Sequence, residues 1–112
     1  MTASTESPRA TAARIVAAWN EQGLYPDRLI ERVERDRALV QQLVYGVVRH
    51  HAALQWCVAQ LVPRAPRVKL ESLLETGLYE LLMETSARPY AAVNETVEAA
   101  KNMLSQREAG FV

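Results

Sequence analysis

Apolar residues recur every three or four positions through most of the chain, and no stretch alternates strictly between apolar and polar side chains. The first spacing places apolar residues on one face of an α-helix, whereas strict alternation is typical of a strand. The clearest run is KLESLLETGLYELLMETS at 69–86. Gly77 lies inside it, where glycine costs about 1 kcal/mol relative to alanine, so we expect another helix to pass close by. The sequence predicts an all-α fold of five or six helices.

Cap residues indicate where the first helices begin and end. Ser7 can cap a helix whose first position is Pro8, because proline suits that position. Gly23 can stop this helix, since glycine adopts the left-handed conformation that ends many helices. We expect a short second helix within 25–35.

The rest of the chain is divided by length and by prolines. Asp36 can cap the segment 36–62, whose 27 residues exceed a typical globular helix. We therefore expect a break or bend near 50–53. The two prolines of PRAPRV at 63–68 interrupt the helix, and a last helix is expected within 88–106.

Composition places the chain among single folded domains. It has 112 residues, of which 49% are hydrophobic, and no apolar run approaches the roughly 18 residues of a membrane helix. Its N-terminus, MTASTESPRA, lacks the apolar core of a signal peptide. We expect residues 1–7 to be disordered, residues 8–112 to form one domain, and the protein to be cytoplasmic without membrane contact.

The residue types that carry catalysis or bind metals are sparse. The single cysteine, Cys57, has apolar neighbours and reads as a small buried hydrophobe rather than a nucleophile. His50 and His51 point about 100° apart on a helix, so they cannot share a metal. Glu80 and Glu84 are one turn apart but look like part of an exposed helix face. We expect no catalytic residue, no metal site and no cofactor.

The net charge of zero hides an uneven distribution. Residues 28–69 carry eight basic and three acidic side chains, a net charge of +5, whereas residues 70–112 have a net charge of −4. Eleven of the thirteen basic residues are arginine, which suits forked contacts with phosphate. Charge alone leaves two interpretations open, nucleic-acid binding and a solvated basic surface.

Four local patterns occur in an order and at spacings that resemble the NusB-like domain. They are DRALVQQLVYGVVR (36–49), LLETGLYELL (73–82), RPYAAVNETVEAAK (88–101) and the closing AGFV (109–112). The resemblance extends from Pro8 onward. PRATAARIV at 8–16, together with the first pattern, makes the chain more similar to the domain at the N-terminus of bacterial 16S rRNA (cytosine-5) methyltransferases than to stand-alone NusB.

This resemblance implies two small helical bundles packed across one another and a non-catalytic RNA-binding domain. In the methyltransferases such a domain precedes a catalytic domain that holds S-adenosylmethionine and a catalytic cysteine, which Cys57 does not match. The chain alone is therefore not expected to be an enzyme. Its implied partners are rRNA and a catalytic domain in cis.

Two alternatives remain open. A stand-alone NusB-like antitermination factor would bind a single-stranded leader RNA and a ribosomal protein. A docking module would bind a partner domain or a second copy without RNA.

The chain also departs from the family pattern. Gln55 stands where the family commonly has aspartate, Glu75 where it has arginine, and Glu80 where it has glutamine. No RNA contact is expected around Glu75. AGFV matches the start of the family's final helix, so the second bundle is expected to lack that helix and to be marginally stable or oligomeric.

The resemblance also indicates candidate RNA-binding residues. Arg9 and Arg14 lie in the first helix, where NusB proteins carry basic RNA-contacting residues; ordinary surface charge is the alternative. Arg37 and Arg49 lie in the first and last turns of one predicted helix, where structural roles compete with RNA contact. Arg107 can present a cation beside the ring of Phe111, whose alternative role is packing in the final helix.

Tyrosines and one polar pair complete the candidates. Tyr45, Tyr79 and Tyr90 can stack on unpaired bases, although packing is the commoner use of such rings. Asn94 and Glu95 are candidates for hydrogen bonds that orient neighbouring helices.

Overall fold

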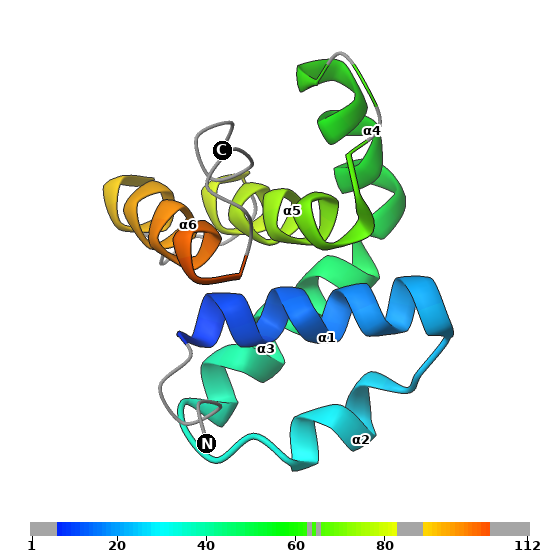
Figure 1. Ribbon diagram of the computed structural model, residues 1–112, viewed down its shortest axis with the longest axis vertical. Helices are drawn as coiled ribbons and strands as arrows, with labels where there is room; N and C mark the ends of the chain where they lie inside the picture. Colours follow the sequence, from blue (N-terminus) through cyan, green and yellow to red (C-terminus); the bar gives the residue numbers. More distant parts are fainter. Residues whose placement is uncertain (1–6, 63, 65, 83–88, 104–112) are drawn as a thin grey trace.

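The computed structural model describes residues 7–62, 64, 66–82 and 89–103, and these residues form six helices and no strand (Figure 1). The expected all-α class is thus confirmed. The helices are α1 (Pro8–Gln22), α2 (Pro26–Glu31), α3 (Arg37–Arg49), α4 (His51–Leu61), α5 (Val68–Leu82) and α6 (Pro89–Met103). Of the N-terminal segment expected to be disordered, only Ser7 lies within the described residues.

Helix α1 begins and ends at the predicted caps. The Ser7 hydroxyl oxygen accepts a hydrogen bond from the Ala10 amide at 3.2 Å, and Pro8 occupies the first turn. Gly23 adopts φ 71°, and its amide donates to the Trp19 carbonyl at 3.0 Å. These contacts satisfy amides and carbonyls that a helix end otherwise leaves open.

The connection between α2 and α3 differs from the expectation. Helix α2 ends at Glu31 and not near residue 35. Asp36 precedes α3, but its φ is 55° and its side chain makes no capping bond. The carbonyl of Asp36 instead accepts from the Val40 amide at 3.0 Å. Aspartate tolerates this left-handed conformation, so Asp36 serves the turn rather than the cap.

The long third segment divides at His50. Helix α3 ends at Arg49 and α4 starts at His51, within the window expected for a break. The His50 amide still donates to the Gly46 carbonyl at 3.1 Å, while its φ of −108° redirects the chain. Gln55, which replaces the family's usual aspartate, lies inside α4.

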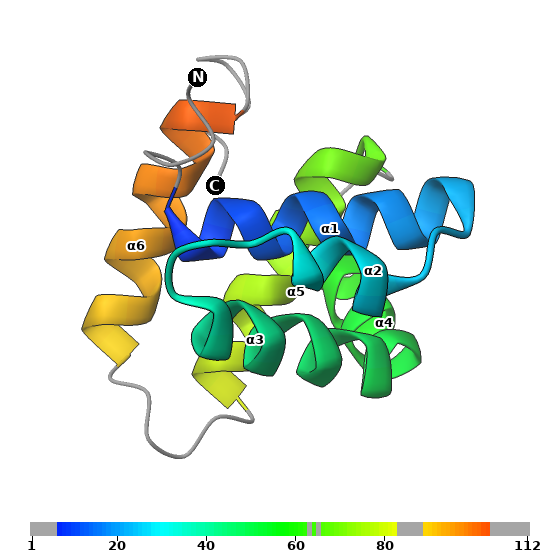
Figure 2. The same ribbon diagram turned by 90° about the horizontal axis from the view of Figure 1, so that it is seen from below.

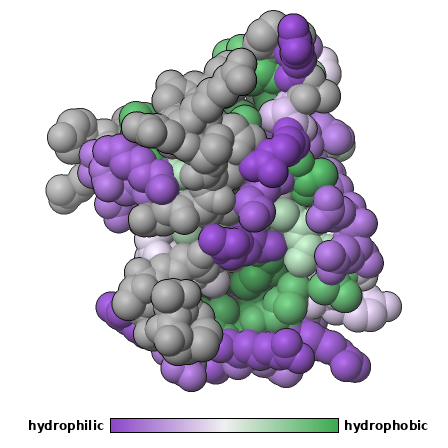
Figure 3. Space-filling view, viewed as in Figure 1, coloured by the Kyte–Doolittle hydropathy of each residue, from purple (hydrophilic) through white to green (hydrophobic). Residues whose placement is uncertain are grey.

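Helix α1 contributes to two separate hydrophobic cores. The first core joins α1 to α2, α3 and α4; its buried residues are Ala12, Ile15, Val16, Ile30, Val40, Leu43, Val44, Val47 and Leu54. The second core joins α1 to α5 and α6 through Ala10, Ala13, Leu73, Ala99 and Ala100. A hydrophobic patch is visible on the surface between α1 and α2, and hydrophilic residues border it (Figure 3). The implied pair of bundles therefore shares a helix.

Small residues allow α6 to lie close to its neighbours. Ala99 and Ala100 are completely buried, and α6 stands beside one end of α1 in both views (Figures 1 and 2). On α5, a Cβ added to Gly77 would lie 3.0 Å from the Thr96 hydroxyl oxygen. The expected close helix approach at Gly77 is thus confirmed, and the neighbour is α6.

Candidate nucleic-acid interface

Most basic side chains of residues 28–69, hereafter the basic segment, lie on the surface. Seven of its eight basic residues are exposed and Lys69 is half-buried. The exposed ones are Arg28, Arg32, Arg35, Arg37, Arg49, Arg64 and Arg67. They come from α2, the turn after it, α3 and the connector before α5. The net charge of +5 on this segment favours contact with a polyanion, and such an attraction weakens with added salt.

Arg9 is placed very differently from these arginines. Its side chain is 14% exposed, and its Nε and Nη2 each donate to one oxygen of Glu80 at 2.7 Å. A longer contact of 3.5 Å joins Nη1 to Glu95. The hydrogen bonds that Arg9 donates to Glu80 raise the pKa of Arg9. This pair ties α1 to α5 and α6, so an RNA phosphate at Arg9 would have to compete with Glu80.

The same contact corrects the interpretation of Glu80. The side chain of Glu80 is 4% exposed. The expectation that Glu80 lies on an exposed helix face is therefore wrong. A buried carboxylate needs a partner to offset its lost hydration, and Arg9 supplies two parallel hydrogen bonds. The polar spacing along α5 gave no hint of this, because the partner lies 71 residues away. Glu95 joins two helices as expected, whereas Asn94 is exposed.

The remaining predicted residues do not form one cluster. Arg14 is exposed on α1. Arg37 donates from Nε to the Val33 carbonyl at 2.8 Å and from Nη2 to the Glu31 carbonyl at 3.3 Å, so it closes the turn after α2. Arg49 is exposed at the other end of α3, about 18 Å away along the helix axis. Arg107 and Phe111 lie outside the described residues.

A cavity of ≈ 380 Å³ opens between α3 and α5, and we call it the α3–α5 groove. Its lining residues are Ala38, Gln41, Gln42, Tyr45, Gly46, Arg49 and Tyr79. It brings the predicted Arg49 together with two of the three tyrosines considered for base stacking. Sequence reasoning missed the two glutamines, which carry no recognisable motif. Tyr90, the third tyrosine, lies in α6, and its side chain is outside the described part.

The ring of Tyr79 is held in place from two sides. A Cβ added to Gly46 would lie 2.1 Å from Tyr79 Cζ, so the tyrosine rests where an alanine side chain would stand. The ring also stacks on His50, with a centroid separation of 6.3 Å and an interplanar angle of 25°. Tyr45 donates its hydroxyl proton to Asp27, and this bond raises its pKa.

His51 and Glu75 form a buried pair that joins α4 to α5. Nδ1 of His51 lies 2.9 Å from Oε1 of Glu75, and the His51 and Trp19 rings pack in a T-shaped arrangement. Glu75 is 1% exposed, and its second oxygen has no hydrogen-bond partner among the described residues. Burial raises the pKa of Glu75 to about 7. The pair is too enclosed to meet a substrate, so we interpret it as a structural contact.

Three further features were sought in the described part of the chain: a metal site, an enclosed cysteine and a membrane-spanning helix. No group of three histidine, cysteine or acidic residues could hold a metal ion there. Cys57 is half-buried in α4 rather than fully enclosed. No described helix is both long and apolar enough to cross a bilayer.

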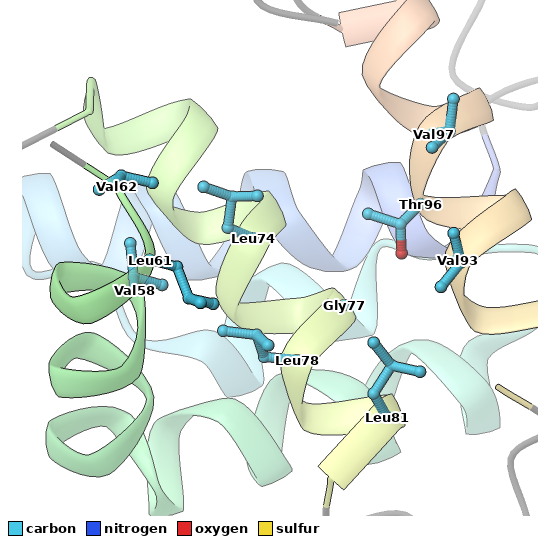
Figure 4. A pocket seen from close by; sticks show the side chains of 10 residues that line it. All are labelled: Val58, Leu61, Val62, Leu74, Gly77, Leu78, Leu81, Val93, Thr96 and Val97. Carbon is cyan, nitrogen blue, oxygen red and sulfur yellow. The ribbon is translucent and has the colours of Figure 1, made fainter. Parts of the chain in front are cut away.

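A second cavity, of ≈ 180 Å³, lies between α4, α5 and α6 (Figure 4). We call it the α4–α6 groove, and its lining is apolar except for Thr96 at the α6 side: Val58, Leu61, Val62, Leu74, Gly77, Leu78, Leu81, Val93, Thr96 and Val97. Leu61 is 68% exposed and Leu82, next to the groove on α5, is 61% exposed. Such exposed leucines are typical of a surface that another element covers.

Known proteins are similar to this chain in sequence. The sequence model described as the NusB family matches residues 6–112. A relative from Pectobacterium carotovorum subsp. carotovorum, named ribosomal RNA small subunit methyltransferase B, is 38% identical over 117 residues. A relative of the same name from Yersinia pseudotuberculosis is 34% identical. Each alignment covers 97% of this chain and 27% of the relative, so the chain spans about a quarter of their length.

Two solved structures share the fold. One is a crystal structure of the antitermination factors NusB and NusE in complex with double-stranded RNA, with a TM-score of 0.80, 20% identity and coverage of 99% of this chain and 91% of that chain. The other is a crystal structure of a plectonemic RNA supercoil, with a TM-score of 0.82, 19% identity and coverage of 96% and 87%. The all-helical arrangement is therefore that of these chains.

Proposed function

We propose that this chain, which belongs to the NusB family, is a non-catalytic RNA-binding domain. The observation that carries the proposal is the exposure of seven arginines in the basic segment. Guanidinium groups pair with phosphate oxygens in a forked geometry. The similar fold in a complex of NusB and NusE with double-stranded RNA supports the same function.

Salt dependence tests this proposal directly. We expect the chain to bind short single-stranded RNA with an affinity that falls steeply between about 50 and about 200 mM salt, because each neutralised phosphate releases counterions. Arg28→Gln and Arg32→Gln, one helical turn apart in the basic segment, should each make that dependence shallower. Lys101→Gln is the matched control, because Lys101 is exposed on α6 outside the segment. Absence of RNA binding at the lowest salt would contradict the proposal.

We further propose that the domain positions rRNA for a 16S rRNA (cytosine-5) methyltransferase. Support comes from relatives named ribosomal RNA small subunit methyltransferase B, of which the chain covers 27%. In such a cytoplasmic enzyme the catalytic domain in cis would bind S-adenosylmethionine. The alternative is a stand-alone antitermination factor that binds a leader RNA and a ribosomal protein. An open reading frame that continues for hundreds of residues with a methyltransferase motif would contradict that alternative.

Protein docking is a second candidate function, favoured by the exposed leucines around the α4–α6 groove. We infer that its occupant is a domain of the same longer polypeptide, since the relatives are about four times as long as this chain. The Pectobacterium relative, deprived of the part that matches this chain, should bind the purified chain in a pull-down. Leu61→Ser should remove that binding. Self-association of the chain alone, measured by sedimentation, would assign the groove to a second copy instead.

A further inference from the structure

We propose that the α3–α5 groove is a base-binding subsite for single-stranded RNA, in which Tyr79 stacks on one unpaired base and Arg49 contacts an adjoining phosphate. This inference rests on the proposed RNA-binding function and assigns one of its contact points. It commits to an unpaired base, because stacking needs a base whose face is open.

The stacking ring is ordered before any ligand enters. Tyr79 is seated on Gly46, where no side chain could stand, and its ring stacks on His50 at 6.3 Å. A ring fixed in this way loses little conformational freedom on binding, which favours affinity. Tyr45 lines the same groove, and its hydroxyl is directed to Asp27 on α2.

The polar groups of the groove suit a nucleotide. None of its seven lining residues is acidic, although the Asp27 carboxylate accepts a hydrogen bond from the Tyr45 hydroxyl beside the groove. Arg49 provides a planar cation with five donors. Gln41 is exposed on the same wall, and a side-chain amide offers both a donor and an acceptor to a base edge. An apolar peptide would leave these groups without partners.

The test compares substitutions at Tyr79 in binding to a short oligouridylate at constant low salt. Tyr79→Leu should weaken the affinity by about tenfold or more, which is the contribution of one stacked base. Tyr79→Phe should retain the affinity, because the ring remains. Trp56→Leu is the matched control: this ring is 65% exposed on α4 and does not line the groove. It should retain the affinity as well.

A second ligand separates stacking from phosphate binding. With an oligomer of the same length whose bases are removed, Tyr79→Leu should bind as well as the unmodified protein. Arg49→Gln should still weaken binding severalfold, since the phosphates remain. If Tyr79→Leu loses affinity equally for both oligomers, the ring does not stack on a base and the subsite is refuted.

If Tyr79→Leu does not fold, ultraviolet crosslinking of the unmodified protein to RNA tests the subsite instead. Crosslinks to bases should map to the peptides that contain Tyr45 or Tyr79. Crosslinks only elsewhere, or unchanged affinity in Tyr79→Leu, would overturn the subsite while salt-dependent RNA binding stands. A lack of binding by the unmodified protein would overturn both proposals.

Discussion

The Arg9 guanidinium on α1 binds both carboxylate oxygens of Glu80 on α5 at 2.7 Å. Both side chains are largely buried, with 14% and 4% of their surfaces exposed. The pair lies beside the second core, close to the buried Ala10. The positive charge of Arg9, which would favour RNA binding at the surface, thus serves a buried ion pair.

Removal of one partner from this pair should strongly destabilise the fold. Arg9→Met leaves the Glu80 carboxylate buried without its main partner, which costs about 3–5 kcal/mol in comparable cases. The double variant Arg9→Met with Glu80→Met should recover most of the loss, because no unpaired charge remains. Urea denaturation followed by circular dichroism measures both free energies of unfolding.

Lys101 and Glu98 provide the control for this measurement. Their ion pair of 3.2 Å lies on the surface, with 61% and 54% of the side chains exposed. Lys101→Met should therefore change the free energy of unfolding by less than about 1 kcal/mol. A similarly small effect of Arg9→Met would show that the buried pair contributes little to stability.

The buried Glu75 should make stability depend on pH. Its pKa rises from an ordinary value of 4.5 to about 7 in the folded state because burial disfavours the charged form. The folded state then binds more protons than the unfolded state, so this stabilising contribution is complete below pH 4.5 and is lost as the pH rises through about 7. The free energy of unfolding should fall across that window.

Substitution identifies the group responsible. Glu75→Gln cannot ionise, so it should flatten the decline between pH 4.5 and pH 7 and should be the more stable protein above that range. Glu71→Gln is the comparison, because Glu71 lies one turn away and also raises the pKa of Glu75, as a secondary cause after burial. An unchanged decline in Glu75→Gln would show that Glu75 does not cause the pH dependence.

The two helical glycines should respond differently to alanine. Gly46→Ala brings a methyl group to within 2.1 Å of the Tyr79 ring, so the ring must move, at a cost of about 1–3 kcal/mol. At Gly77 the nearest atom is the Thr96 hydroxyl oxygen at 3.0 Å. The helix propensity of alanine, worth about 1 kcal/mol, offsets this milder crowding. Thermal unfolding should show a clear loss for Gly46→Ala and little change for Gly77→Ala; the reverse order would contradict the seating of Tyr79.

Features determined by neighbouring residues could be predicted from the sequence. Ser7, Pro8 and Gly23 act within one helical turn, and their side chains or missing side chains set the bounds of α1. Gly77 also carried its own signal, because a glycine inside a leucine-rich helix is costly unless another helix needs the space. The predicted break in 36–62 followed from length, and the structure has it at His50.

Features that depend on distant partners were not predictable. Glu80 looked exposed because its partner, Arg9, is far away in the chain. Asp36 looked like a cap, but its backbone is left-handed and its side chain makes no capping bond. The groove around Tyr79 depends on Gly46 in another helix, and no local pattern links the two. Among the candidate arginines, exposure separates Arg49 from Arg9 only once the fold is known.

The sharing of α1 between two cores has a consequence for how the chain acquires its structure. The buried residues of the first core all lie within residues 12–54, whereas the second core needs α1 to meet α5 and α6. Contacts so distant in sequence slow folding, because a large loop closes before they form. During synthesis, α1 would leave the ribosome before α5 and α6 and would pack against them only later. We therefore expect α5 and α6 to acquire their packing only together with α1, in one cooperative transition.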